Sequence, residues 1–107
     1  MSARGLIDTS AILALLDRGD PRHGKCLEAL KSVDLPLGTT EAVLAELFYF
    51  VGENQQIRKY AWGFVRSSLT EITSMNADDL PHLEALMEKY ADRPMDYADA
   101  TLVRAGE

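Results

Sequence analysis

Short segments that favour β-strand alternate with segments of helical spacing, and this alternation constrains the fold more than any other feature of the 107 residues. The strand-like segments are Gly5-Leu6-Ile7, Leu35-Pro36-Leu37-Gly38 and Leu69 to Thr73. Between and after them, apolar residues recur every three or four positions, which is typical of amphipathic helices. Parallel strands joined by helices are the arrangement that such alternation favours. We therefore predict an α/β fold with a mainly parallel central sheet.

Capping residues and glycine delimit the expected helices. Ser10 is the expected N-cap of the first helix, Thr39 or Thr40 caps the third, and Asp96 caps the last. Gly52 is expected to end the third helix. The first helix is expected to run from Ser10 until Gly19-Asp20-Pro21 break it, and the next three cover 22–32, 40–51 and 55–67. Asn76 or Asp78 opens a long helix through Tyr90, and Arg93-Pro94 then separate a last helix. We expect packing residues in the second helix (Cys26, Leu27, Leu30) and in the fourth (Tyr60, Trp62, Phe64).

Composition places the chain among small single-domain proteins, so we expect residues 1–107 to form one domain. Hydrophobic residues make up 47%, which is enough for one packed core. No apolar run approaches the roughly 20 residues that a membrane-spanning helix needs. Because Met1 to Arg4 do not open a signal peptide and Cys26 has no second cysteine to pair with, we expect a cytoplasmic location.

The net charge of -6 argues against a general nucleic-acid-binding protein, which usually shows a basic surface. It does not argue against a nuclease, because clustered metal-binding acids contribute to the negative total and bound cations would reverse the local sign. Basic residues that could hold an anionic substrate are spread along the chain: Arg4, Arg18, Arg22, Lys25, Arg58, Lys59 and Arg66.

Three carboxylates occupy unusual positions for acids. Asp8 follows the first apolar strand segment, Glu46 interrupts the apolar run 42–51, and Asp99 lies within Ala98–Val103. The helical neighbours of Glu46 at three and four residues are all uncharged, so no local ion pair accounts for it. Acids gathered on apolar faces repel one another, and Mg²⁺ or Mn²⁺ bound by their oxygens would relieve that repulsion.

Each acid also has a purely structural interpretation. Asp8 could cap the first helix, although Thr9 and Ser10 could do this in its place. Glu46 could extend along a partly exposed helix to reach water. Asp96 could be only an N-cap, and Asp99 only a partner of the helix dipole.

Three segments resemble the motifs of PIN domains, in particular those of the VapC-type toxins of toxin–antitoxin pairs. The first runs from Leu6 to Asp17 (LIDTSAILALLD), the second from Thr39 to Glu46 (TTEAVLAE) and the third from Met95 to Val103 (MDYADATLV). Their order and spacing match over essentially the whole chain. The resemblance implies a PIN-like α/β/α sandwich with a parallel sheet.

The same resemblance implies a metal-dependent endoribonuclease that hydrolyses RNA phosphodiester bonds with Mg²⁺ or Mn²⁺. Asp8, Glu46 and Asp99 would be its catalytic, metal-binding acids, and Asp96 would be an additional metal-binding candidate. Thr9 and Ser10 would line the site. The expected partners are an RNA substrate, a small antitoxin protein and a second copy of the chain.

One departure from the family pattern leaves alternatives open. The family usually continues into a further strand with a fourth acid, whereas this sequence ends at Gly106-Glu107, so we expect a truncated domain without its C-terminal strand or strands. A catalytically impaired PIN remnant that binds protein or nucleic acid is therefore the alternative function. A phosphoryl-transfer domain with Asp8 as nucleophile is a weaker one, because no second aspartate follows two residues later.

Overall fold

The computed structural model describes residues 5–92 and 95–107, so the predictions made for Arg4 and for Arg93-Pro94 lie outside the described residues. Strands β1 (Gly5–Leu6), β2 (Leu37–Thr40) and β3 (Thr70–Thr73) form a parallel sheet in the order β1-β2-β3. In its register, Gly5 lies opposite Leu37 and Leu37 opposite Thr70. The predicted α/β class and parallel sheet are confirmed.

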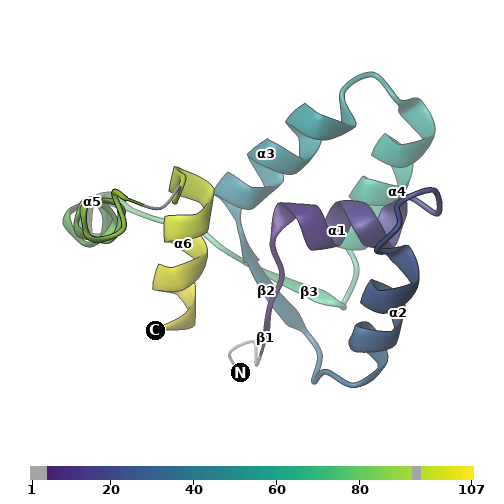
Figure 1. Cartoon of the computed structure of the whole chain (residues 1–107), viewed down its shortest axis with the longest axis horizontal. Helices are drawn as coiled ribbons and strands as arrows, with labels where there is room; N and C mark the ends of the chain where they lie inside the picture. The colour runs from purple at the N-terminus through teal and green to yellow at the C-terminus, as the bar shows by residue number, and fades with distance from the viewer. Residues whose placement is uncertain (1–4, 93–94) are drawn as a thin grey trace.

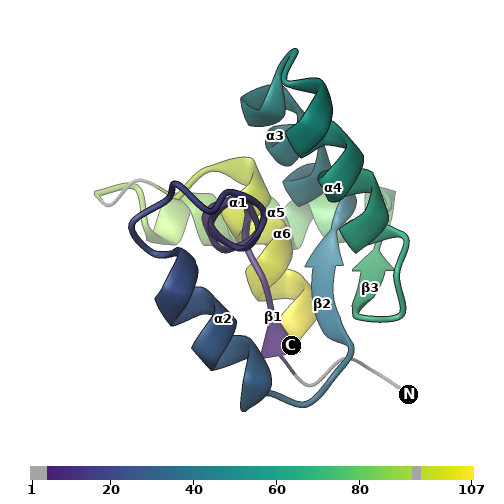
Figure 2. The same cartoon turned by 90° about the vertical axis from the view of Figure 1, so that its right-hand side faces the viewer.

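Helices connect and cover the strands (Figure 1). They are α1 (Thr9–Leu16), α2 (His23–Lys31), α3 (Glu41–Val51), α4 (Gln55–Val65), the short 3₁₀ helix η1 (Ala77–Asp79), α5 (Leu80–Lys89) and α6 (Tyr97–Gly106). Figures 1 and 2 place α5 and α6 on one side of the sheet and α2 and α4 on the other. Across the described part of the chain, none of these helices has the length and apolar character that a membrane span requires.

Most helix ends agree with the predicted caps, but three predictions are wrong: the cap of the first helix, the end of α4, which lies at Val65 and not at Ser67, and the single helix over 76–90, which is divided into η1 and α5. Thr40 caps α3 by accepting a hydrogen bond from the Val43 N–H, and Asp96 caps α6. Gly52 ends α3 with φ of 57°, a left-handed conformation that glycine adopts without strain. The predicted cap Ser10 is wrong, because Asp8 has the extended backbone of an N-cap and Ser10 already lies within α1.

The core lies around the central strand. All four residues of β2 are buried, and the largest fully buried side chains include Ile12 of α1 and Leu47 of α3. Strand β1 is less buried than its apolar sequence predicted, because Leu6 is exposed and only the following Ile7 is buried. This difference follows from the sheet order, in which β1 lies at an edge of the described sheet.

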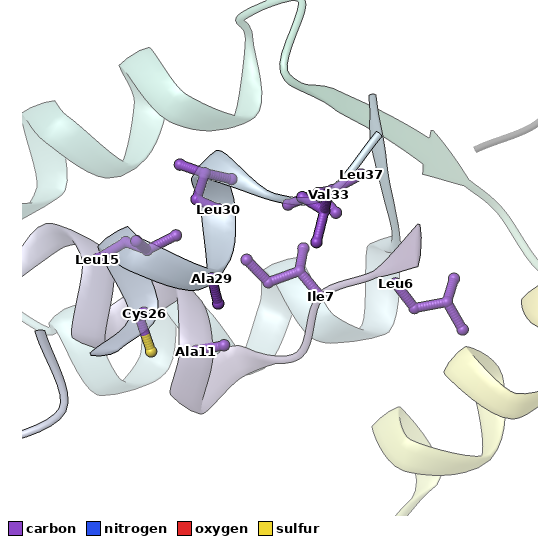
Figure 3. A pocket seen from close by; sticks show the side chains of 9 residues that line it. All are labelled: Leu6, Ile7, Ala11, Leu15, Cys26, Ala29, Leu30, Val33 and Leu37. Atoms are coloured by element: carbon purple, nitrogen blue, oxygen red, sulfur yellow. The ribbon is translucent and has the colours of Figure 1, made fainter. Parts of the chain in front are cut away.

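The packing predicted for α2 and α4 is only partly correct. Leu27, Tyr60 and Trp62 are exposed, whereas Cys26, Leu30 and Phe64 are partly buried. Cys26 and Leu30 help to line an apolar pocket of about 150 Å³ between α1, α2 and the strands, which Figure 3 shows from close by. Helix α2 therefore packs on α1 and faces the strands across this pocket, and none of its residues is fully buried.

Candidate active site

Three helices begin near the carboxyl ends of β1 and β2, where ligands gather in parallel sheets. Helix α1 follows β1 directly and α3 follows β2 directly, while α6 packs against both α3 and β2. Figure 1 shows the first turns of α1, α3 and α6 at the same end of the sheet. Helix N-termini carry partial positive charge, so this end of the molecule favours an anion such as a phosphate.

Asp8 lies where β1 passes into α1. Its Oδ1 accepts a hydrogen bond from the Ala11 N–H at 2.9 Å and another from the Ser10 hydroxyl at 3.3 Å. Asp8 is thus an N-cap, as its structural interpretation required. Both hydrogen bonds reach the same oxygen, so Oδ2 of this exposed carboxylate keeps its lone pairs for another ligand.

Asp96 and Asp99 form a reciprocal capping box at the start of α6. Asp96 Oδ1 accepts from the Asp99 N–H at 2.8 Å, and Asp99 Oδ2 accepts from the Asp96 N–H at 3.3 Å. The structural interpretation of Asp96 as an N-cap is confirmed. The two hydrogen bonds hold both carboxylates in fixed orientations at the first turn of α6.

The pKa of Asp99 is raised above its usual value. Partial desolvation of the carboxyl is the largest cause, the hydrogen bond from the Asp96 N–H opposes it, and the negative charges of Asp96 and Asp8 raise the pKa further. Asp8, at the other end of the sequence, makes the smallest of these contributions. A cation bound by these carboxylates would offset their mutual repulsion and lower the pKa of Asp99.

Glu46 lies in the second turn of α3 and is partly buried. Its carboxylate has no hydrogen-bond or ion-pair partner within residues 5–92 and 95–107. In that same part of the chain, no three Asp, Glu, His or Cys side chains lie close enough together to hold a metal ion. Of the four candidate acids, Asp96 and Asp99 are joined directly by their capping box, and within the described residues no three acids form a group that could hold an ion.

The two hydroxyl residues predicted to line the site have other partners in this structure. Thr9 is buried, and its hydroxyl lies 3.5 Å from the Val43 carbonyl oxygen, to which it donates. Ser10 is exposed and donates to Asp8. Thr9 thus links α1 to α3, and Ser10 orients the Asp8 carboxylate.

A buried threonine pair, which the sequence did not reveal, joins two sides of the site. Thr40 Oγ1 and Thr101 Oγ1 lie 2.7 Å apart, and both side chains are fully buried. Thr101 donates its hydroxyl proton to the Ala98 carbonyl at 2.7 Å, so Thr40 must be the donor to Thr101. The bond fixes the second turn of α6 against the start of α3. Thr40 was recognisable as a cap, but nothing in the sequence marked Thr101 as its partner.

The chemistry of the candidate ligands, though not their spacing among the described residues, suits a hard divalent cation. The candidate ligands are all carboxylates, and oxygen ligands are those that Mg²⁺ and Mn²⁺ prefer. The raised pKa of Asp99, caused in part by the neighbouring acids Asp96 and Asp8, is the electrostatic mark of negative charges that a cation would neutralise.

Comparison with known proteins agrees with this fold. The profile of the PIN domain matches residues 5–104, and the chain belongs to the PIN domain family. Among curated proteins, it is 30% identical to Ribonuclease VapC26 of Mycobacterium tuberculosis over 105 residues, which cover 92% of this chain and 74% of that protein.

Among solved structures, the chain is similar to the crystal structure of Mycobacterium tuberculosis VapC20, described as a sarcin–ricin loop cleaving toxin. The TM-score is 0.78 at 24% identity, with 94% of this chain and 78% of that chain covered. At this level of identity the match concerns the fold. The predicted family and PIN-like fold are thus confirmed.

Proposed function

We propose that this protein is a metal-dependent endoribonuclease that hydrolyses RNA phosphodiester bonds as the toxin of a toxin–antitoxin pair. The observation that carries the proposal is that Asp8 caps α1 and Asp99 lies in the first turn of α6, two helices that begin at the same end of the sheet as α3 (Figure 1). Membership of the PIN domain family and the similarity to a curated ribonuclease support the same activity.

The proposed ligands of Mg²⁺ or Mn²⁺ are Asp8, Glu46 and Asp99, with Asp96 as an additional ligand. When bound, such an ion supplies a water of lowered pKa and neutralises charge on the reacting phosphate. The Ala11 N–H and the Ser10 hydroxyl orient the Asp8 carboxylate, and the Asp96 N–H orients that of Asp99. The N-termini of α1, α3 and α6 stabilise a phosphate placed between them.

The family relationship also supports proposals about partners and setting. They are a small antitoxin protein that inhibits the enzyme, a homodimer, a cytoplasmic location, and a single PIN-like domain over residues 1–107. Each rests on the resemblance to VapC-type toxins and on the match to residues 5–104.

The test is cleavage of a generic single-stranded RNA in Mn²⁺ and in EDTA, by the wild type and by Asp8→Asn and Asp99→Asn. Asparagine keeps an oxygen acceptor at both caps, so the variants should stay folded. Asp34→Asn is the matched control, because Asp34 is an exposed aspartate in the loop before β2. We expect cleavage only with metal, retained in Asp34→Asn and lost in the other two variants.

Metal-dependent cleavage by Asp8→Asn would refute the proposed site. The alternative, a PIN remnant that only binds a partner, predicts no cleavage and no rise in melting temperature with millimolar Mn²⁺. A functional metal site must instead stabilise the folded state, since the ion binds only that state.

A further inference from the structure

Helix α4 presents a basic groove on its outer face. Gln55, Arg58, Lys59, Trp62, Gly63 and Arg66 line this open groove of about 540 Å³. Their spacing of three and four residues places them on one side of the helix. In Figure 2, α4 runs along the side of the molecule that faces the viewer. We call this surface the α4 groove.

Among residues 5–92 and 95–107, the cations of the α4 groove have no acidic partner. Elsewhere, Arg22 pairs with Asp20 at 3.0 Å and Lys31 with Glu28 at 3.2 Å. In the described part of the chain, the three cations of the groove form no ion pair, and the buried Nε of one of them, Arg58, has no hydrogen-bond partner. Three unpaired positive charges on one face of a protein of net charge -6 form a local binding surface for an anion.

An aromatic ring lies among these charges. Trp62 is 50% exposed, although its sequence predicted a packing residue. Its ring centroid lies 4.6 Å from that of Phe48, with a 36° angle between the rings, so α3 supports the indole from one side. A supported, half-exposed indole between cations has the composition of a stacking platform for a nucleic-acid base.

We propose that the α4 groove binds single-stranded RNA, with phosphates on Arg58, Lys59 and Arg66 and one base stacked on Trp62. This inference rests on the proposed function, because it assigns to the ribonuclease a surface that holds its substrate outside the acidic site. An acidic protein segment could satisfy the three cations, but it would leave the exposed indole unexplained.

The chain contains one tryptophan, so its intrinsic fluorescence reports on Trp62 alone. The protein is titrated in EDTA with a single-stranded RNA of about twelve nucleotides, and with an oligonucleotide of equal length that carries phosphates but no bases. EDTA prevents metal-dependent cleavage during the titration. We expect the RNA to quench the fluorescence of Trp62, and the oligonucleotide without bases to bind more weakly without quenching.

Glycine substitutions test the charge of the groove without removing native contacts. A Cβ added at Gly63 or at Gly24 of α2 meets no atom within 4 Å outside its own helix backbone. Gly63→Glu should weaken RNA binding about fivefold or more, the factor that corresponds to one unit-charge contact in water. Gly63→Gln, of equal size but neutral, and Gly24→Glu, of equal charge on another helix, should each change it by less than about twofold.

The salt dependence of binding gives a second measurement. The double variant Lys59→Gln/Arg66→Gln should reduce the slope of log K against log salt concentration by about 1.4, at roughly 0.7 for each lost phosphate contact with a single strand. The matched double variant Lys25→Gln/Lys31→Gln on α2 has the same net charge and should keep the wild-type slope.

The proposal is overturned if the RNA does not bind, or if it binds without quenching Trp62. It is also overturned if Gly63→Glu and Gly24→Glu bind the RNA equally well, or if an acidic peptide titrated in the same way quenches Trp62 and the RNA does not. None of these results depends on catalysis, because the titration measures binding in EDTA. The cleavage assay with Asp8→Asn measures the proposed activity separately, so the two failures are distinguishable.

Discussion

Replacing Thr101 by valine should destabilise the protein by about 2–4 kcal/mol, although the two side chains have nearly the same shape. The substitution removes the hydroxyl that donates to Ala98 and accepts from Thr40. One net hydrogen bond is worth about 1 kcal/mol, and the Thr40 hydroxyl, left buried without an acceptor, costs about 1–3 kcal/mol more. The sum gives the stated range.

The double variant Thr40→Val/Thr101→Val isolates the bond between the two helices. Thr40→Val alone loses the N-cap of α3, worth about 1 kcal/mol, together with the bond to Thr101. In the double variant no hydroxyl is orphaned, so the combined loss should be smaller than the sum of the single losses by about 1–3 kcal/mol. Thr39→Val is the control, because the buried Thr39 hydroxyl donates to Ile7 and shares no partner with Thr101.

Urea denaturation of all variants measures these free energies of unfolding. The loss of unfolding free energy in the double variant Thr39→Val/Thr101→Val should equal the sum of the two single losses within about 0.5 kcal/mol. If the loss in Thr40→Val/Thr101→Val also equals the sum of its single losses within that error, a bond linking Thr40 to Thr101 is refuted. In the cleavage assay, Thr101→Val should reduce activity more than Thr39→Val does, because the bond fixes the helix that holds Asp99.

Two further predictions concern charge. The pKa of Asp79 is lowered, chiefly by the hydrogen bond from the Asn76 N–H and then by the one from Arg104. Ionised Asp79 therefore stabilises the folded protein at pH values above its usual pKa, and this stabilisation is lost as the pH falls below about 4. Asp79→Asn should therefore show a smaller loss of unfolding free energy between pH 7 and pH 3 in urea titrations, and an unchanged loss would contradict this. The raised pKa of Asp99 means that its ionised form is disfavoured in the folded state, so without metal Asp99→Asn should be at least as stable as the wild type at pH 7. In the wild type, Mn²⁺ at 100 times its Kd should add about 2.7 kcal/mol, and an equal thermal shift in Asp99→Asn would exclude Asp99 as a ligand.

The local architecture follows from the sequence because capping and periodicity act over a few residues. Thr40, Asp96 and Gly52 mark the ends of helices through their own side chains or backbone, so their roles were predictable. The error at Ser10 has the same local origin. Several adjacent residues could cap α1, and only the extended backbone of Asp8 decides which one does.

The candidate site was predictable as a set of residue types and not as a geometry. The sequence by itself determined the alternation of strands and helices, and with it the parallel sheet and the position of Asp8 at the carboxyl end of β1. Only the tertiary structure decided that the charge of Asp8 contributes to the raised pKa of Asp99. It also decided that Thr40 forms a hydrogen bond to Thr101, 61 residues away, and that Trp62 lies exposed among cations. These features depend on which faces of distant helices pack together. That choice is set by the summed burial of the whole core, and no short stretch of sequence encodes it.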